Sequence, residues 1–231
     1  MQIVELSVLG VRAARQTMRS PDGEVSVTLF AMIHIGQASF YEQVYADTSQ
    51  HDVVLVEGLR SPVARIITSS YRWIDKAKLD LIVQPRHPVG ASGKPRIVHA
   101  DLSIDEFHRE WRGIPLWLKL LMTTFAPVIG LHRRVFATRE SLAKAMEMED
   151  RLSSEEVLSL DPRFAALRRT ILHMRDERLV ERLGEELDRT MDRPKTIAVV
   201  YGAAHMRAVL KELGRRNFRT AGASWQVVMA F

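Results

Sequence analysis

The sequence predicts a single α/β domain over residues 1–231, with a mixed, mostly parallel central sheet flanked by helices. Short, continuously apolar runs recur along the chain, and each is typical of a buried strand. Helical patterns separate several of these runs, which is the order expected of parallel strands joined by crossover helices. The stretch from about 103 to 190 contains no convincing strand, so we expect it to form a helical insertion or cap.

Each predicted element follows from a local pattern. Val25–Ile33 begins as an alternating run and ends continuously apolar, as a strand does when it enters a buried sheet. Ser39 and Glu42 have the spacing of a capping box at the start of a helix, and Ser103 and Glu106 repeat it. The predicted strands are residues 3–9, 25–33, 53–56, 96–100, 196–201 and 224–231. The predicted helices outside the insertion are about 40–50, 62–79 and 204–213.

Composition excludes several classes of protein. The 231 residues are 46% hydrophobic and 26% charged, which is typical of a globular domain and not of a disordered chain. The absence of cysteine excludes disulfide frameworks, zinc ribbons, iron–sulfur clusters and thiol nucleophiles. The net charge is +5, and acidic residues are interleaved with the basic ones along the chain. We therefore expect no nucleic-acid partner, because such a partner requires a clustered basic face.

Location and surface contacts are predicted from two segments. Residues 1–6 lack the layout of a signal peptide, which favours a cytoplasmic protein. The segment 113–131 is apolar apart from Lys119, but it contains Pro115 and Pro127. A charge near its middle makes a membrane span unfavourable. The segment is instead predicted to contact a membrane surface or to form a homo-oligomer interface.

Polar side chains stand at the carboxyl ends of four predicted strands. His34 follows the strand 25–33, and Glu57 follows the strand 53–56. His99 and Asp101 stand at the end of the strand 96–100, and His205 follows the strand 196–201. Ligands of open α/β sheets bind beyond the carboxyl ends of the strands. A single histidine in such a place is usually a hydrogen-bonded structural group, but the combination predicts a functional site.

These residue types predict a divalent metal site. Two imidazoles from His34 and His205 with the carboxylate of Glu57 form a facial ligand set that suits Mn, Co or Zn. Water bound to such a metal becomes a nucleophile near neutral pH. Glu57 is either a ligand or the general base, and His99 and Asp101 are additional candidates for ligation or for orienting a metal-bound histidine.

The same residues carry a resemblance to the TraB/PrgY/GumN family, which is related to the Tiki metalloproteases and, more distantly, to the erythromycin esterases and ChaN-like proteins. The family pattern is Gly-x-x-His after one strand, Glu after the next, an Arg-Asn pair in a late helix, and a second Gly-x-x-His. Here the first motif is Ala31–His34, with Ala in place of Gly, and the second is Gly202–His205. Glu57 matches the Glu, and Arg178 followed by Leu179 matches the Arg-Asn pair without its Asn.

The resemblance implies a metal-dependent hydrolase that acts on a peptide or amide bond of a peptide or small-molecule substrate. Glu57 and Arg178 would be the catalytic residues, with Arg178 stabilising an oxyanion. The alternative is a non-catalytic regulatory or peptide-binding protein that keeps the fold, which the two departures at Ala31 and Leu179 favour. The sequence leaves the substrate, the identity of the metal and the oligomeric state open.

Overall fold

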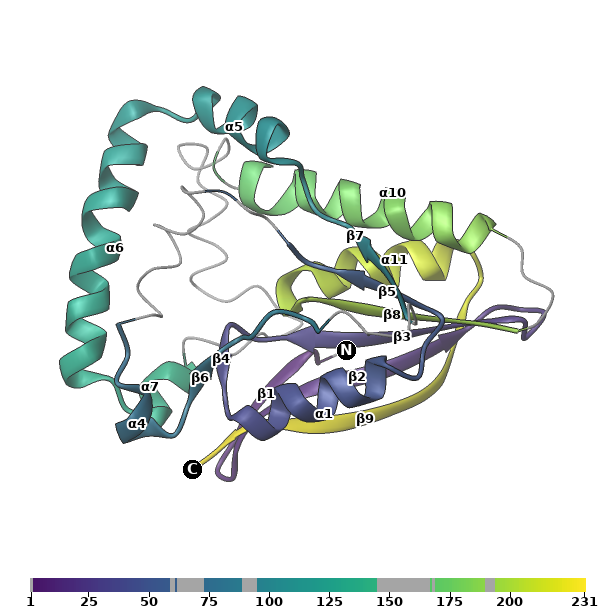
Figure 1. Ribbon diagram of the computed structural model, residues 1–231, viewed down its shortest axis with the longest axis horizontal. Coiled ribbons are helices and arrows are strands. Elements are labelled where there is room, and N and C mark those ends of the chain that lie inside the picture. The colour runs from purple at the N-terminus through teal and green to yellow at the C-terminus, as the bar shows by residue number, and fades with distance from the viewer. Residues whose placement is uncertain are drawn as a thin grey trace.

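A computed structural model of the protein describes residues 2–58, 61, 73–88, 95–144, 167, 169–189 and 194–231. Most of the helix predicted over 62–79 lies outside the described residues. The remainder confirms the predicted α/β class: a mixed central sheet with helices packed around it (Figure 1). Within 103–190 the described residues form helices and no strand, as the sequence predicts.

One large sheet forms the centre of the protein. Its strands are β1 (Val4–Ser7), β2 (Gly10–Arg19), β3 (Val25–Met32), β5 (Val53–Val56), β7 (Arg96–His99), β8 (Lys195–Gly202) and β9 (Arg219–Ala230), and a separate two-stranded sheet joins β4 (Ile35–Gly36) to β6 (Ile82–Val83). The strand order is β1-β2-β3-β8-β5-β7, and β9 also pairs with β2. The pairs from β3 to β7 are parallel, whereas β2 is antiparallel to all of its neighbours.

The position of β8 decides where the functional residues meet. The predicted strand–helix–strand unit is present as β3, α1 (Ala38–Thr48) and β5, but β3 and β5 are not neighbours. β8, which comes from the end of the chain, lies between them and is parallel to both. The carboxyl ends of β3, β8 and β5 therefore lie side by side at one edge of the sheet.

The helices of the body pack close to this sheet. Helix α10 (Met174–Asp188) contacts β5 and helix α11 (Met206–Arg215), and Figure 1 shows the two helices side by side. Leu179 and Leu183 of α10 are fully buried in the core together with Ile197 to Val200 of β8. Helix α1 is capped differently from the prediction: its N-cap is Gln37, without a side-chain hydrogen bond, so the capping box proposed at Ser39 is wrong.

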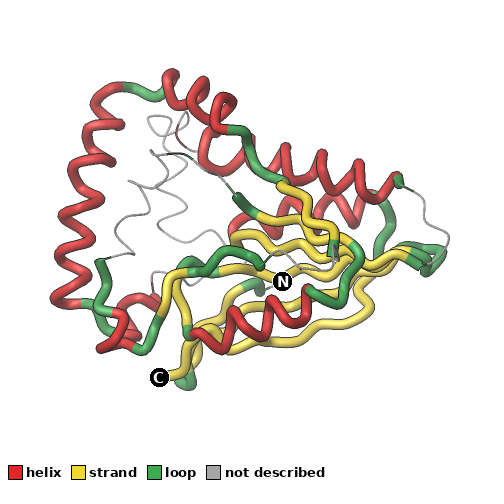
Figure 2. Tube along the Cα trace, in the orientation of Figure 1, coloured by secondary structure: helices red, strands yellow, loops and turns green. Residues whose placement is uncertain are grey.

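The remaining helices form an arm beside the body. We call helices α5 (Ile104–Gly113) and α6 (Leu116–Phe136) the α5–α6 arm. Figure 2 shows α6 standing apart from the strands of the sheet, with α5 at one end and α7 (Arg139–Lys144) at the other. The predicted capping box at Ser103 and Glu106 is confirmed, because both of its hydrogen bonds are present.

No single helix of the described residues is both long enough and apolar enough to cross a membrane. Helices α5 and α6 are long and apolar enough to do so only when taken together, and a bend of 115° separates them.

Candidate functional site

The predicted strand-end residues come together around the end of β8. Met32 of β3 is in register with Gly202 of β8, and Val56 of β5 is in register with Val200. Glu57 follows β5 directly, and its backbone N–H donates to the Val200 carbonyl at 3.2 Å. Residues from three segments of the chain are thus placed at one edge by the parallel register alone.

Glu57 is at the centre of the site, and both of its carboxylate oxygens are engaged. Oε2 accepts a hydrogen bond from the backbone N–H of Gly202 at 2.8 Å, which ties the end of β5 to the end of β8. Oε1 lies 2.5 Å from Nη2 of Arg175, on the first turn of α10. A side chain at position 202 would crowd the same carboxylate, because an added Cβ would lie 3.2 Å from Oε2. The close approach of the Glu57 carboxylate to the backbone therefore explains the glycine.

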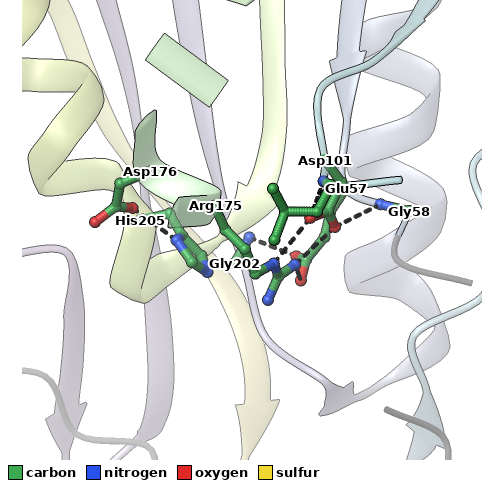
Figure 3. A network of polar contacts seen from close by, with 8 residues as sticks. Glu57, Gly58, Asp101, Arg175, Asp176, Gly202 and His205 are labelled. Atoms are coloured by element: carbon green, nitrogen blue, oxygen red, sulfur yellow. Dashed lines mark hydrogen bonds and ion pairs between the residues drawn. The ribbon is translucent and has the colours of Figure 1, made fainter. Parts of the chain in front are cut away.

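Arg175 also binds Asp101, which follows β7. Arg175 Nε donates to Asp101 Oδ1 at 2.9 Å, and Nη2 donates to Oδ2 at 2.8 Å, a two-point pairing of guanidinium with carboxylate. The backbone N–H groups of Leu102 and Gly58 add hydrogen bonds to Asp101 at 2.8 and 3.2 Å. Figure 3 shows Arg175 between the carboxylates of Glu57 and Asp101 on one side and the His205–Asp176 pair on the other.

The charges of this cluster keep one another ionised although they are buried. Burial alone would raise the pKa of Glu57, but Arg175 first, and then His34 and His205, bring it below its ordinary value. Burial likewise opposes ionisation of Asp101, and the hydrogen bond and charge of Arg175 bring its pKa below the ordinary value. Burial opposes the charged form of Arg175 as well, yet the two carboxylates raise its pKa well above the usual range.

His205 is held by a carboxylate of its own. Its ring is buried at the start of α11, and Nδ1 lies 2.7 Å from Oδ1 of Asp176, the residue after Arg175. An ionised carboxylate only accepts, so Nδ1 carries the proton and Nε2 is left as a basic nitrogen. The rings of His205 and Tyr201 are in edge contact at 4.9 Å between centroids. The Arg175 guanidinium lies 5.4 Å from the same Tyr201 ring, so one aromatic side chain positions both groups.

The other two predicted histidines lie at the rim. His34 is exposed beyond the end of β3, and its backbone carbonyl accepts the N–H of Gln84 at 2.9 Å. Its charge is one of the contributions that lower the pKa of Glu57. His99 ends β7 and is exposed, and its Nδ1 would lie 3.2 Å from a Cβ added to Gly58.

The predicted metal ligands are near one another but do not form a ready cation site. Among the described residues no three histidine or acidic side chains are placed to share one ion. Glu57 is bound to a guanidinium and to a backbone N–H, and a dication beside Arg175 would meet like charge. The residues as arranged do not fit a three-ligand site, and the divalent metal stays a prediction.

Arg178 lies one turn beyond Arg175 and has different partners. It pairs with Glu106 at the start of α5 and with Glu181 at 2.7 Å. It also lines a cavity of about 490 Å³ that adjoins the cluster, together with Gly58, His99, Asp101, Leu102, Ser103, Asp105, Glu106, Arg109 and Arg182. The predicted oxyanion role of Arg178 stays a prediction, and its position is at the wall of this cavity.

The prediction from sequence missed Arg175, Asp176 and the ring of Tyr201. A signal for Arg175 was present: it precedes the buried Leu179 and Leu183 by four and eight residues, so it lies on the buried stripe of α10. The π-helical segment Arg169–His173 directly precedes α10, and such segments often occur at functional sites.

No protein-family model, curated protein or solved structure matches the chain. The geometry of the strand-end residues is therefore the basis for a proposal of function.

Proposed function

We propose that the chain is a hydrolase that cleaves a peptide or amide bond at this edge of the sheet, with His205 as the general base. The observation that carries the proposal is the 2.7 Å pairing of His205 Nδ1 with Asp176. A carboxylate on one ring nitrogen fixes the imidazole and strengthens the other nitrogen as a base. Nε2 of His205 would remove a proton from the attacking water and later deliver it to the leaving nitrogen.

Arg175 would stabilise the negative charge that develops on the carbonyl oxygen. Its Nε and Nη2 groups are held by Asp101 and Glu57. The third nitrogen of the guanidinium, Nη1, makes no hydrogen bond to the described residues. It is also not fully buried, so its N–H groups are accessible. A guanidinium fixed on two sides can donate to an oxyanion without reorganising. Glu57 and Asp101 act in this scheme as positioning residues.

The resemblance to the TraB/PrgY/GumN family supports the same assignment with one change. Arg175 followed by Asp176 takes the place of the family's Arg-Asn pair, with Asp for Asn. This assignment replaces the pair at Arg178 and Leu179 and puts the arginine beside the glutamate. Arg178 would then contact the substrate from the wall of the adjoining cavity.

A metal-dependent form of the reaction remains part of the proposal. His34, His205 and Glu57 are the predicted ligands of a Mn, Co or Zn ion, but among the described residues they are not arranged to share one, so they would hold it only after a rearrangement. Glu57 would first have to give up part of its pairing with Arg175. No step above depends on the ion.

The test is cleavage of a peptide library by the purified chain, with and without chelator, and with Mn, Co or Zn added. We expect turnover to fall by roughly 100-fold or more in His205→Ala, as for loss of a general base. His132→Ala, on exposed α6, is the matched control and should keep full activity. Turnover that chelator removes and metal restores supports the metal-dependent form; turnover that survives chelator supports the metal-free form.

The second candidate is a non-catalytic peptide-binding protein. The full pairing of Glu57 and Asp101 with Arg175 favours it, since a saturated ion cluster can be structural. Tight peptide binding without turnover under every metal condition would favour this function and contradict the hydrolase.

A further inference from the structure

The outward face of α6 is apolar and exposed along its whole length. Leu118, Ala126 and Gly130 form one buried stripe of the helix. On the opposite side Leu120, Leu121, Phe125, Val128, Leu131 and Val135 are each between 42% and 59% exposed. We call these six residues the α6 apolar face. A continuous exposed face of large apolar side chains is unusual in a monomeric protein and indicates a binding surface.

The charged side chains of the segment 112–139, which contains this face, are all cations. Residues 112–139 contain five cations, Arg112, Lys119, Arg133, Arg134 and Arg139, and no carboxylate. This excess is as large as the net charge of +5 of the whole chain. The rest of the sequence is therefore balanced, and the positive charge is concentrated where the apolar face is exposed.

An exposed apolar face within a positively charged segment favours one kind of partner over another. A second copy of the chain packed on the α6 apolar face would bring two segments with five cations each together, which is unfavourable. A bilayer with anionic headgroups offers apolar chains and negative charge in adjacent layers. A helix of 21 residues is about 30 Å long and can lie in that interface with one face inward.

We propose that the α6 apolar face docks the protein on the surface of an anionic phospholipid bilayer, with α6 lying in the plane of the interface. At Leu118, Ala126 and Gly130 the helix stays covered by the protein, and the α6 apolar face is the part that it presents to the lipid. The proposal goes beyond the hydrolase assignment and does not depend on it, because it uses none of the strand-end residues.

The experiment is flotation of the full chain with phosphatidylcholine vesicles, with and without about 30% phosphatidylglycerol to supply a negative surface potential. We expect binding to the anionic vesicles and at least about tenfold weaker binding to the neutral ones or at high salt. The variant Leu120→Ser/Phe125→Ser/Val128→Ser should lose the binding by a similar factor. The variant Arg112→Gln/Arg134→Gln should lose mainly the preference for anionic lipid.

The matched control is Val8→Ser/Leu9→Ser, which removes two apolar side chains at the β1–β2 turn that are even more exposed, at 92% and 77%. It should bind like the parent. The single change Phe125→Ser serves if the triple variant does not fold, and circular dichroism checks both. A parent chain that never floats would overturn the proposal. So would equal loss in the control, or a concentration-dependent dimer that the triple variant abolishes, which would make the face an interface between copies.

Discussion

In most proteins apolar side chains are buried and charged ones are exposed. The strand-end cluster of Glu57, Asp101 and Arg175 and the α5–α6 arm depart from this pattern in opposite ways. At the strand ends, Arg175 and Asp101 are charged yet only 11% and 2% exposed. On the arm, Phe125 and Val128 are apolar yet 54% and 59% exposed. Buried charges must be paired within the chain, and here they are. A contiguous exposed face of large apolar side chains indicates a contact with a partner outside the chain. In the cluster the buried charges are paired within the chain, whereas on the arm the apolar side chains of α6 are left exposed.

The largest effect is expected when the cluster loses its cation. Arg175→Ala would leave the carboxylates of Glu57 and Asp101 buried without a counter-charge. Breaking a buried ion pair from one side costs about 3–5 kcal/mol. We expect a loss of unfolding free energy of this size in urea denaturation, with Arg175→Lys recovering only part of it, since lysine cannot pair at two points.

Arg182→Ala is the matched control for this change. Arg182 lies on the same helix and pairs with Glu185 at 2.8 Å, but both side chains are about 40% exposed. An exposed pair of this kind contributes less than about 1 kcal/mol. If the two arginine variants proved equally stable, the cluster would not be the self-sufficient region described above.

Acid should weaken the cluster and leave helix α6 of the arm unaffected, because α6 contains no carboxylate. The pKa values of Glu57 and Asp101 are below their ordinary values of 4.5 and 3.8. Groups with lowered pKa values in the folded state stabilise it above the unfolded pKa, and this contribution disappears as the pH falls from about 4.5 towards the folded values. Each unit of lowering corresponds to about 1.4 kcal/mol.

Unfolding free energies measured from pH 7 to pH 3 check this prediction. The parent should lose stability through the acid range, and Asp101→Asn should show a flatter profile because one titrating group is gone. Parallel profiles for the two chains would contradict it. Helix α6 (Leu116–Phe136) contributes no titrating carboxylate to either profile.

The sequence predicts those strands whose local run of apolar residues corresponds to side chains that are buried in the fold. The continuously apolar Val53–Val56 and Ile197–Tyr201 are recognisable as buried strands, and both are central in the sheet. β2 was not predicted, because Arg, Ala and Gln fill Gly10–Arg19. Pairing with β3 and with β9 imposes the strand, and long-range pairing of this kind leaves no local pattern.

The site was predicted to the same extent. Glu57 and His205 could be placed, since the carboxyl ends of parallel strands meet at one edge. The sequence analysis placed the arginine at Arg178 and did not use the spacing of Arg175 from Leu179 and Leu183, which indicates the side of α10 that faces the sheet. That rotation is set by the packing of Leu179 and Leu183, and it turns Arg175 inward.

The smallest effect concerns the attachment of the arm to the body. Arg139, at the start of α7, donates from Nε to the Leu79 carbonyl at 2.8 Å and from Nη1 to the Ala230 carbonyl at 2.7 Å. Arg139→Ala removes both hydrogen bonds, but the side chain is 28% exposed, so water can replace them. We therefore expect a loss of only about 1 kcal/mol.

Hydrogen exchange distinguishes a local effect of this variant from a global one. Amides of α6 and α7 should exchange faster, because the far end of the arm is released. The amide of Gly202, which donates to Glu57 at 2.8 Å, should exchange as in the parent. Faster exchange at Gly202 would mean that the arm and the cluster open together. The two regions would then form one cooperative unit, and the contrast between them would be one of composition and not of stability.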